Sequence, residues 1–283
     1  MGNRTRTEED IIRRKLASYS VGLAMTLSRP VEASHLHIAS GFLLEEVPGE
    51  RVLVTAGHFI ELVHNCLDLE IVEGICVHHQ DHAIEQNLKQ YILSPSLFRS
   101  QSRAARNGID VGVLAVEDEL RQSLDADLVP VISTEKHCGR SEERGSCLVI
   151  GHSVDGSTTV RLSTLEVIAD GERETHERFG IGNICGRFES IETCDLQGGS
   201  IILKPHLRGR PSVKGMSGGL VVLVDDDKPE DLLWIGQQSM EKRTADGKEC
   251  EYLRATHAGD VIRGVLDCIN QFPGHSPDAP SQI

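Results

Sequence analysis

The sequence contains no uninterrupted run of about 18 apolar residues, the length that a membrane-spanning helix requires. Residues 1–19 are charged throughout and lack the apolar stretch of a secretory signal peptide. Basic residues are in deficit, because 29 Lys and Arg oppose 43 Asp and Glu and give a formal net charge of −14. A nucleic-acid backbone is bound by a basic surface, so neither nucleic acid nor membrane is an expected partner.

The cysteine content also bears on the compartment. Eight cysteines are present, an even number that would indicate a disulfide framework in a short secreted chain. Without an export signal we expect a cytoplasmic protein with reduced thiols, several of them filling core space as small apolar side chains. One bridge stays open at this point: Cys185 and Cys194 would pair if they lay across a hairpin with Cα atoms within about 7 Å.

Strand-like segments dominate the chain. With 39% hydrophobic and 25% charged residues, 283 residues suffice for one large all-β domain or two smaller lobes. About ten short β-branched segments, alternating or continuously apolar, follow one another between Gly, Pro, Asp and Asn. This pattern predicts an all-β sandwich or barrel.

Two segments have helical spacing instead. Thr7 supplies an N-cap followed by acidic residues, which predicts a helix over residues 8–19. A second helix is expected within residues 258–272. The polar residues 117–133 are expected to connect two lobes, and the Pro- and Ser-rich residues 273–283 are expected to be disordered.

The most informative short stretch is VKGMSGGLVV, residues 213–222, where Ser217 stands among three glycines. A nucleophilic serine needs a base, a group that orients the base, and backbone N–H donors for the oxyanion. Gly215 permits a conformation that residues with a Cβ atom avoid, and would turn the N–H groups of Gly215 and Ser217 toward one point. Gly218 and Gly219 leave room for a substrate backbone. Because such a turn is more often a tight bend, a base must be found elsewhere.

A base and its orienting acid are both available. His58 ends the apolar segment RVLVTAGHF, where small residues at 55–57 open space around the ring. Asp110 begins another apolar run, and a carboxylate there is costly unless it is paired, for which a histidine N–H is suitable. The ordinary alternatives are a histidine satisfied at a strand end and an aspartate that caps its own turn.

In the order His, Asp, Ser these residues resemble the trypsin-like serine peptidases of the chymotrypsin fold. The family's LTAxH motif is matched by residues 53–58, its D-[IL]-A-[LV] motif by 110–113, and its GDSGGP motif by 215–220. Residues 40–43, SGFL, are similar to the GSGF segment of the bacterial, HtrA-like branch. The resemblance covers roughly residues 21–262.

The resemblance implies an all-β fold of two six-stranded antiparallel β-barrels, with the triad in the cleft between them. The implied units are an N-terminal helix (1–20), a first barrel with His58 and Asp110 (21–125), a second barrel with Ser217 (126–257), a C-terminal helix (258–272) and a tail (273–283).

It also implies an endopeptidase that uses no metal or organic cofactor and acts on a protein or peptide substrate. His58 would be the base, Asp110 would hold its tautomer, and the N–H groups of Gly215 and Ser217 would bind the oxyanion. By resemblance, substrate-binding residues would come from the segment before Ser217 and from a later strand: Ser212, Val213, Gly236, Gln237 and Ser239. For Gln237 and Ser239 the alternative is ordinary strand polarity.

Three departures from the family pattern are visible. Met216 replaces the aspartate that holds the freshly cut N-terminus in secreted zymogens, Phe59 replaces a common cysteine, and Leu220 replaces the usual proline. None removes a catalytic group. Because the usual activation switch is missing, we expect activity to be gated by a regulatory protein partner or by the N-terminal segment.

Other readings remain. The chain would alternatively be a catalytically silent trypsin-fold module that binds extended peptides by strand addition, or an esterase with the same triad. A structural zinc site is a weaker hypothesis, set against a histidine-rich surface loop. Its candidate ligands are His64, Cys66, Cys76, His78, His79 and His82.

Overall fold

The computed structural model describes most of the chain. The described residues are 15–31, 34–47, 50–80, 88–92, 98–103, 109–116, 118–126, 129–138, 146–169, 172–197, 200–205, 214–224, 232–243, 245 and 250–270. The expected tail and most of the expected N-terminal helix lie outside them, and of that helix residues 15–17 are helical.

The first half of the chain forms an eight-stranded sheet in the order β5-β4-β1-β2-β3-β7-β6, with β8 added beside β2. Its strands are β1 (Val21–Val31), β2 (Ser34–Val47), β3 (Glu50–Thr55), β4 (Val72–Gln80), β5 (Leu88–Ile92), β6 (Phe98–Arg103), β7 (Ile109–Ala115) and β8 (Val131–Ser133). All its pairings are antiparallel except that of β8 with β2.

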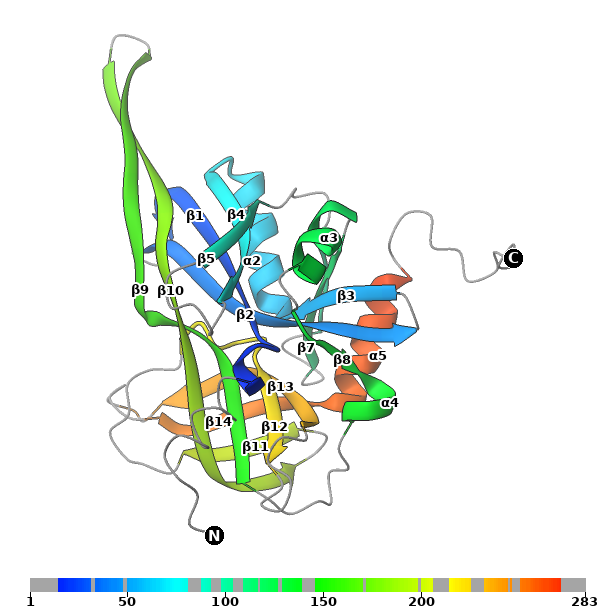
Figure 1. Ribbon diagram of the computed structural model, residues 1–283. Coiled ribbons are helices and arrows are strands. Elements are labelled where there is room, and N and C mark those ends of the chain that lie inside the picture. The colour runs from blue at the N-terminus through cyan, green and yellow to red at the C-terminus, as the bar shows by residue number, and fades with distance from the viewer. Residues whose placement is uncertain are drawn as a thin grey trace, which may run out of the picture.

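The second half forms a closed barrel in the order β10-β11-β14-β13-β12-β9 (Figure 1). Its strands are β9 (Ser146–Ala169), β10 (Glu172–Gln197), β11 (Ser200–Pro205), β12 (Leu220–Val224), β13 (Leu233–Arg243) and β14 (Cys250–His257). The mostly β class with two antiparallel sheets is confirmed. The first sheet departs from the expected six strands, partly because apolar residues of the expected polar connection pair as β8.

Helices flank the first sheet. They are α2 (Gly57–Asp68), α3 (Asp118–Ala126), α4 (Thr134–His137) and α5 (Ala258–Ile269). The last occupies the segment in which a C-terminal helix was expected. The strand expected to run through His58 ends at Thr55, and α2 follows directly, because Phe59, Ile60, Val63 and Cys66 recur at helical spacing and are buried. None of the described helices is long and apolar enough to span a membrane.

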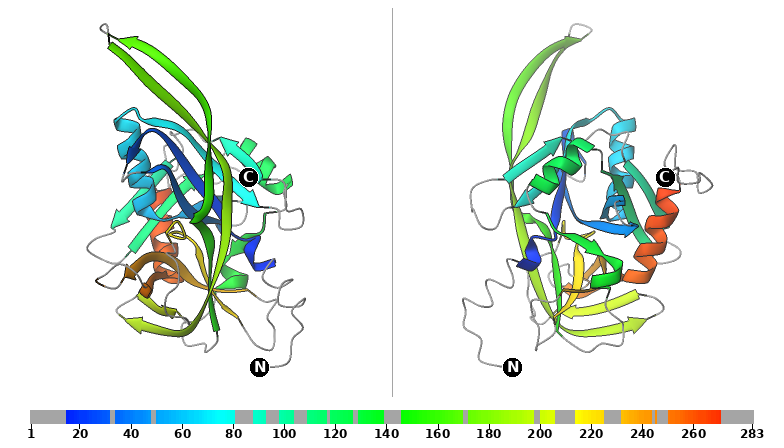
Figure 2. Two further views of the ribbon diagram at one scale, coloured as in Figure 1. Left: turned by 90° about the vertical axis from the view of Figure 1, so that its left-hand side faces the viewer. Right: turned by 45° about the vertical axis from the view of Figure 1, so that its right-hand side comes forward.

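β9 and β10 form a long hairpin arm. β9 pairs with β12 over residues 146–150, and beyond them with β10 alone, as the hairpin extends past the first sheet (Figures 1 and 2). The bridge considered between Cys185 and Cys194 is wrong, because both lie on β10. At about 3.3 Å per residue they are several times too far apart for a disulfide.

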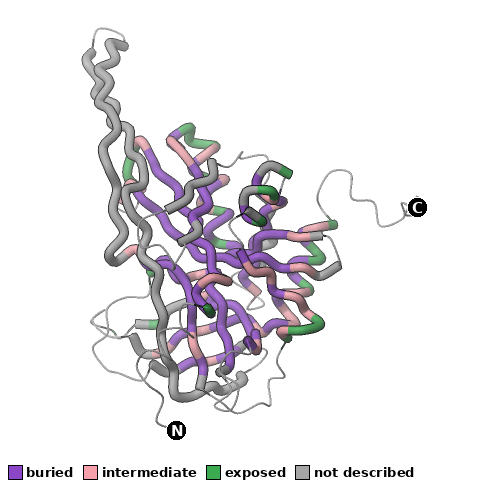
Figure 3. Tube along the Cα trace, viewed as in Figure 1, coloured by how far each residue is buried: buried purple, intermediate pink, exposed green. Residues whose placement is uncertain are grey.

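Three large groups of buried side chains, besides a small fourth group around Ile38, stabilise this arrangement, and Figure 3 shows the buried stretches running through the strands of both sheets. One lies between the first sheet and α2, and a second fills the barrel around Val149 and Val221. The third joins the two halves, since it combines Phe42 of β2, Trp234 of β13 and Val265 of α5. The rings of Phe42 and Trp234 meet edge to face at 5.4 Å. This shared core fixes one half relative to the other.

Candidate functional site

His58 and Asp110 form a hydrogen-bonded pair at one edge of the first sheet. β3 and β7 are neighbours, so the helix that begins after β3 places His58 beside the start of β7, where Asp110 lies. The Nδ1–H of His58 donates to Asp110 Oδ2 at 2.6 Å, and the backbone N–H of His58 donates to Oδ1 at 2.8 Å. Both carboxylate oxygens are therefore occupied, which fixes the imidazole tautomer with Nε2 as the free acceptor.

The packing of α2 against β7 is close because Gly112 has no side chain. A Cβ atom at Gly112 would lie 2.5 Å from Ile60 Cγ1 of the helix. The helix therefore approaches the strand closely enough for the short contact between His58 and Asp110. Asp110 is nearly covered, with a side chain 9% exposed, while the ring of His58 is 48% exposed. The ring thus has its carboxylate contact inside the protein and its other edge open.

The pKa of His58 follows from this environment. Partial burial lowers the pKa of the ring, but the hydrogen bond to Asp110 and the negative charges of Asp110 and Glu61 outweigh it. The net result is a pKa raised above 6.5. A histidine in this range is suited to accept and return a proton near neutral pH.

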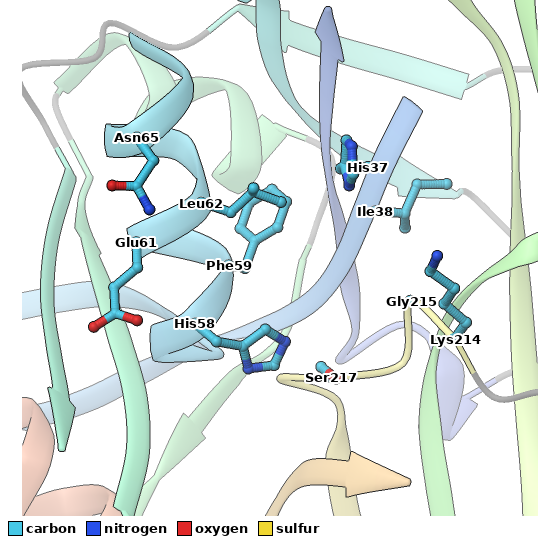
Figure 4. Close-up of a pocket in the computed structure, with 10 residues that line it drawn as sticks. All are labelled: His37, Ile38, His58, Phe59, Glu61, Leu62, Asn65, Lys214, Gly215 and Ser217. Carbon is cyan, nitrogen blue, oxygen red and sulfur yellow. The ribbon is translucent and has the colours of Figure 1, made fainter. Parts of the chain in front are cut away.

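Ser217 lies in the same cavity as His58. The cavity has a volume of about 380 Å³ and is lined by His37, Ile38, His58, Phe59, Glu61, Leu62, Asn65, Lys214, Gly215 and Ser217. Figure 4 shows the imidazole beside Ser217, with α2 on one side and the Lys214–Gly215 turn on the other. Among the described residues no hydrogen bond joins the two side chains. Such contacts are often loose until substrate binds.

The carbonyl groups of the turn around Ser217 are anchored, which fixes the direction of the N–H groups of Gly215 and Ser217. The carbonyl of Lys214 accepts from the N–H of Val154 at 2.9 Å, and that of Met216 accepts from the N–H of Gly219 at 2.8 Å. In a trans peptide the N–H points opposite to the C=O. The N–H groups of Gly215 and Ser217 therefore point away from these contacts. Gly215 has φ +96°, a value open to glycine and strained for other residues.

The expected substrate-binding residues are only partly placed. Ser212 and Val213 lie outside the described residues. Gly236 and Gln237 are buried in β13, Ser239 donates to the carbonyl of Arg254 at 3.1 Å, and none of the three lines the cavity of Figure 4. Their strand, β13, is hydrogen-bonded to the turn around Ser217, because the N–H of Gly218 donates to the carbonyl of Gln238 at 2.8 Å. Their role in binding stays a prediction.

Most residues of the cavity wall were not expected from the sequence. Their signal was present, because His58, Glu61, Leu62 and Asn65 follow the spacing i, i+3, i+4, i+7 and so share one face of α2. A strand prediction through His58 hides that face. His37 and Lys214 carry no local pattern, since they reach the cavity only through tertiary packing.

The candidate zinc ligands do not assemble. His64 and Cys66 lie on α2, where residues two apart point to different sides, and Cys66 is buried in the core. Cys76 Sγ lies 3.0 Å from His78 Nε2, and burial raises the pKa of Cys76 to about 12 and lowers the pKa of His78 to about 4. The side chains of His79 and His82 lie outside the description. Over the part of the chain that is described, no three metal-ligating side chains cluster.

Comparisons with known proteins add little to this geometry. A scan against protein-family models and a search of curated proteins gave no match. Among solved structures, an inactive form of a serine-to-alanine mutant of Rv3671c from M. tuberculosis H37Rv is similar over 93% of this chain and 92% of that chain. The identity is 12% and the TM-score 0.45. A likeness of this size supports no conclusion on activity.

Proposed function

We propose that the protein is a trypsin-like serine endopeptidase with Ser217 as nucleophile, His58 as base and Asp110 as the group that orients the base. The supporting observation is that His58, held by a hydrogen bond of 2.6 Å to Asp110, lines the same cavity as Ser217. The N–H groups of Gly215 and Ser217, directed away from their anchored carbonyls, supply the third requirement.

The mechanism follows from these positions. Ser217 Oγ attacks the carbonyl carbon of the scissile peptide while His58 Nε2 takes the hydroxyl proton, and Asp110 stabilises the imidazolium that results. The oxyanion of the tetrahedral intermediate accepts from the N–H groups of Gly215 and Ser217. His58 then gives its proton to the leaving amine, and an acyl-enzyme remains on Ser217. Water, activated by His58, releases the second product.

A fluorophosphonate probe tests the proposal. The probe phosphonylates an activated serine with loss of fluoride, so wild-type protein is expected to be labelled, and mass spectrometry of a digest is expected to place the label on Ser217. Absence of labelling on folded protein would favour the rival, a silent module that binds extended peptides by strand addition. If labelling occurs, comparing turnover of peptide and ester substrates separates an endopeptidase from an esterase.

The activity is expected to fall as pH is lowered, with a midpoint above 6.5. His58 must be neutral to accept the proton of Ser217, and its raised pKa moves the change to a higher pH than for an unperturbed histidine. The rate of fluorophosphonate labelling, measured from pH 5 to pH 9, gives this midpoint. A midpoint below 6.5 would contradict the assigned balance between burial and the charges of Asp110 and Glu61.

We further propose that the enzyme acts inside a bacterial cell and that residues 1–20 or a protein partner gate it. Met216, which stands at the position of the aspartate that activates secreted family members, is fully buried in the barrel core. Ser20 Oγ lies 3.4 Å from His152 Nδ1. The backbone N–H of His152 donates to the hydroxyl of Ser40, which donates to the carbonyl of Gly215 in the turn around Ser217. Deleting residues 1–20 is expected to change the rate of peptide hydrolysis. An unchanged full rate with nothing added refutes gating by either route.

A further inference from the structure

We propose that Ser40 is a positioning residue that holds the oxyanion turn in its working conformation. It lies on β2 of the first sheet, fully buried, whereas the turn belongs to the second barrel. The inference rests on the proposed function, because it assigns a role within that same site.

The carbonyl groups of the turn show how it is held. Four consecutive carbonyls, those of residues 214–217, each accept a hydrogen bond. Val154 and Gly219 supply backbone N–H donors for two of them, as described above. Ser40 supplies both of the others: its N–H donates to the carbonyl of Ser217 at 2.8 Å, and its hydroxyl donates to the carbonyl of Gly215 at 3.0 Å. Ser40 therefore holds the carbonyl groups of the residues on both sides of Met216.

The hydroxyl of Ser40 both accepts and donates a hydrogen bond in this position. It accepts from the backbone N–H of His152 at 2.7 Å while it donates to Gly215. Gly151 makes room for it, since a Cβ atom there would lie 2.5 Å from Ser40 Oγ. The turn has one other side-chain anchor, the hydroxyl of Ser153, which lies 3.5 Å from the Lys214 carbonyl that Val154 already holds. The carbonyl of Gly215 is held by the Ser40 hydroxyl at 3.0 Å, so a substitution at Ser40 removes this anchor without altering the backbone.

Ser40 also connects the turn to the strand that leads to the base. The hydroxyl of Thr55 donates to the carbonyl of Ser40 at 2.7 Å, and Thr55 is the last residue of β3, three positions before His58. On the other side of Ser40, a Cβ atom at Gly218 would lie 2.1 Å from that same carbonyl oxygen. Ser40 therefore contacts both the strand that leads to His58 and the turn that carries Ser217.

Removal of the hydroxyl has a specific consequence. The carbonyl of Gly215 and the N–H of His152 both lose a partner in a buried place, which favours rearrangement. The carbonyl of Gly215 belongs to the peptide between Gly215 and Met216, which links the peptides that carry the N–H groups of Gly215 and Ser217. Without its anchor this peptide is free to rotate at Gly215, whose φ of +96° glycine tolerates, and the two N–H groups then no longer point toward one oxyanion. We expect a rate about 10- to 100-fold lower in Ser40→Ala, less than the 10²–10³ lost when an oxyanion donor is removed outright.

The test compares the pH dependence of labelling by diisopropyl fluorophosphate, a small probe without peptide contacts, in wild type, Ser40→Ala and Ser28→Ala. Ser28 is the matched control, since its hydroxyl also donates to a backbone carbonyl, that of Ile71, but at the far end of β1. The plateau rate at high pH reports the oxyanion site, and the midpoint reports the pKa of His58. The proposal expects Ser40→Ala to lower the plateau and leave the midpoint unchanged, with Ser28→Ala like wild type.

Each other outcome has a separate meaning. If Ser40→Ala has the same plateau rate as wild type, the positioning role is wrong. It is also wrong if the midpoint shifts, because the substitution would then act through the pKa of His58. If folded wild-type protein is not labelled at all, it is the proposed function that fails. Ser40→Cys keeps a side-chain donor at this position, although the thiol is a weaker donor and somewhat larger than the hydroxyl. Its plateau is expected between those of serine and alanine, and it decides the matter if Ser40→Ala does not fold.

Discussion

Replacing Ser217 with alanine is expected to lower the rate of peptide hydrolysis by about 10⁶-fold, the loss seen when the nucleophile of a comparable triad is removed. The substitution removes the hydroxyl that the proposal assigns as nucleophile while leaving the His58–Asp110 pair and the anchored carbonyls in position. Stability is expected to change little, since Ser217 is half-buried at the cavity and its side chain makes no hydrogen bond among the described residues.

The measurement is kcat on a fluorescein-labelled unfolded protein such as casein, with Ser28→Ala prepared in parallel. Ser28→Ala removes the same group from the same type of residue and is expected to retain the wild-type rate. A Ser217→Ala protein that keeps more than a tenth of the wild-type rate would show that another residue is the nucleophile. The melting temperatures of both variants establish that the protein assayed is folded.

Replacing Asp110 with asparagine is expected to lower kcat by about 10⁴-fold, because an amide does not hold the tautomer that leaves Nε2 free. The shape of the side chain is retained, so the contact with the backbone N–H of His58 can persist. The substitution also removes the two largest influences that raise the pKa of His58. Burial then dominates, and the midpoint of the pH profile is expected to move below 6.5.

The pH dependence of stability checks the same assignment. A histidine whose folded-state pKa is raised stabilises the native protein at pH values below its unfolded pKa of about 6.5, and this contribution is lost as pH rises through the folded pKa. In Asp110→Asn this loss is expected to disappear. Urea unfolding from pH 5 to pH 9 measures it, and an identical pH dependence in both proteins would show that the pair does not perturb His58.

The sequence predicted those features that depend on local pattern. Alternating β-branched segments identified most strands, and the three motifs singled out His58, Asp110 and Ser217. α2 was missed because its apolar residues continue the run of β3, so that a change of period from two to 3.6 is hidden at Ala56. The hairpin considered between Cys185 and Cys194 was wrong because both residues lie on one long strand, β10, whose length no local pattern in the sequence marks.

The contacts of Ser40 were beyond a reading of the sequence for another reason. Its hydroxyl bonds to residues 112 and 175 positions away along the chain. Although Ser40 begins the SGFL segment, nothing local shows that its hydroxyl reaches the turn around Ser217. The same holds for the cavity wall contributed by His37 and Lys214. Such residues become visible only when the two halves are brought together by the core around Phe42 and Trp234.

That core contains a residue whose fluorescence reports on the packing of the two halves. Trp234 is its single tryptophan, it is fully buried, and its indole N–H donates to the carbonyl of Gly236 at 2.8 Å. Because its ring packs against Phe42 of the other half, separation of the halves would hydrate the indole even with the barrel intact. Its emission therefore registers the docking of the two lobes, the event that brings acid, base and alcohol within reach of a common substrate.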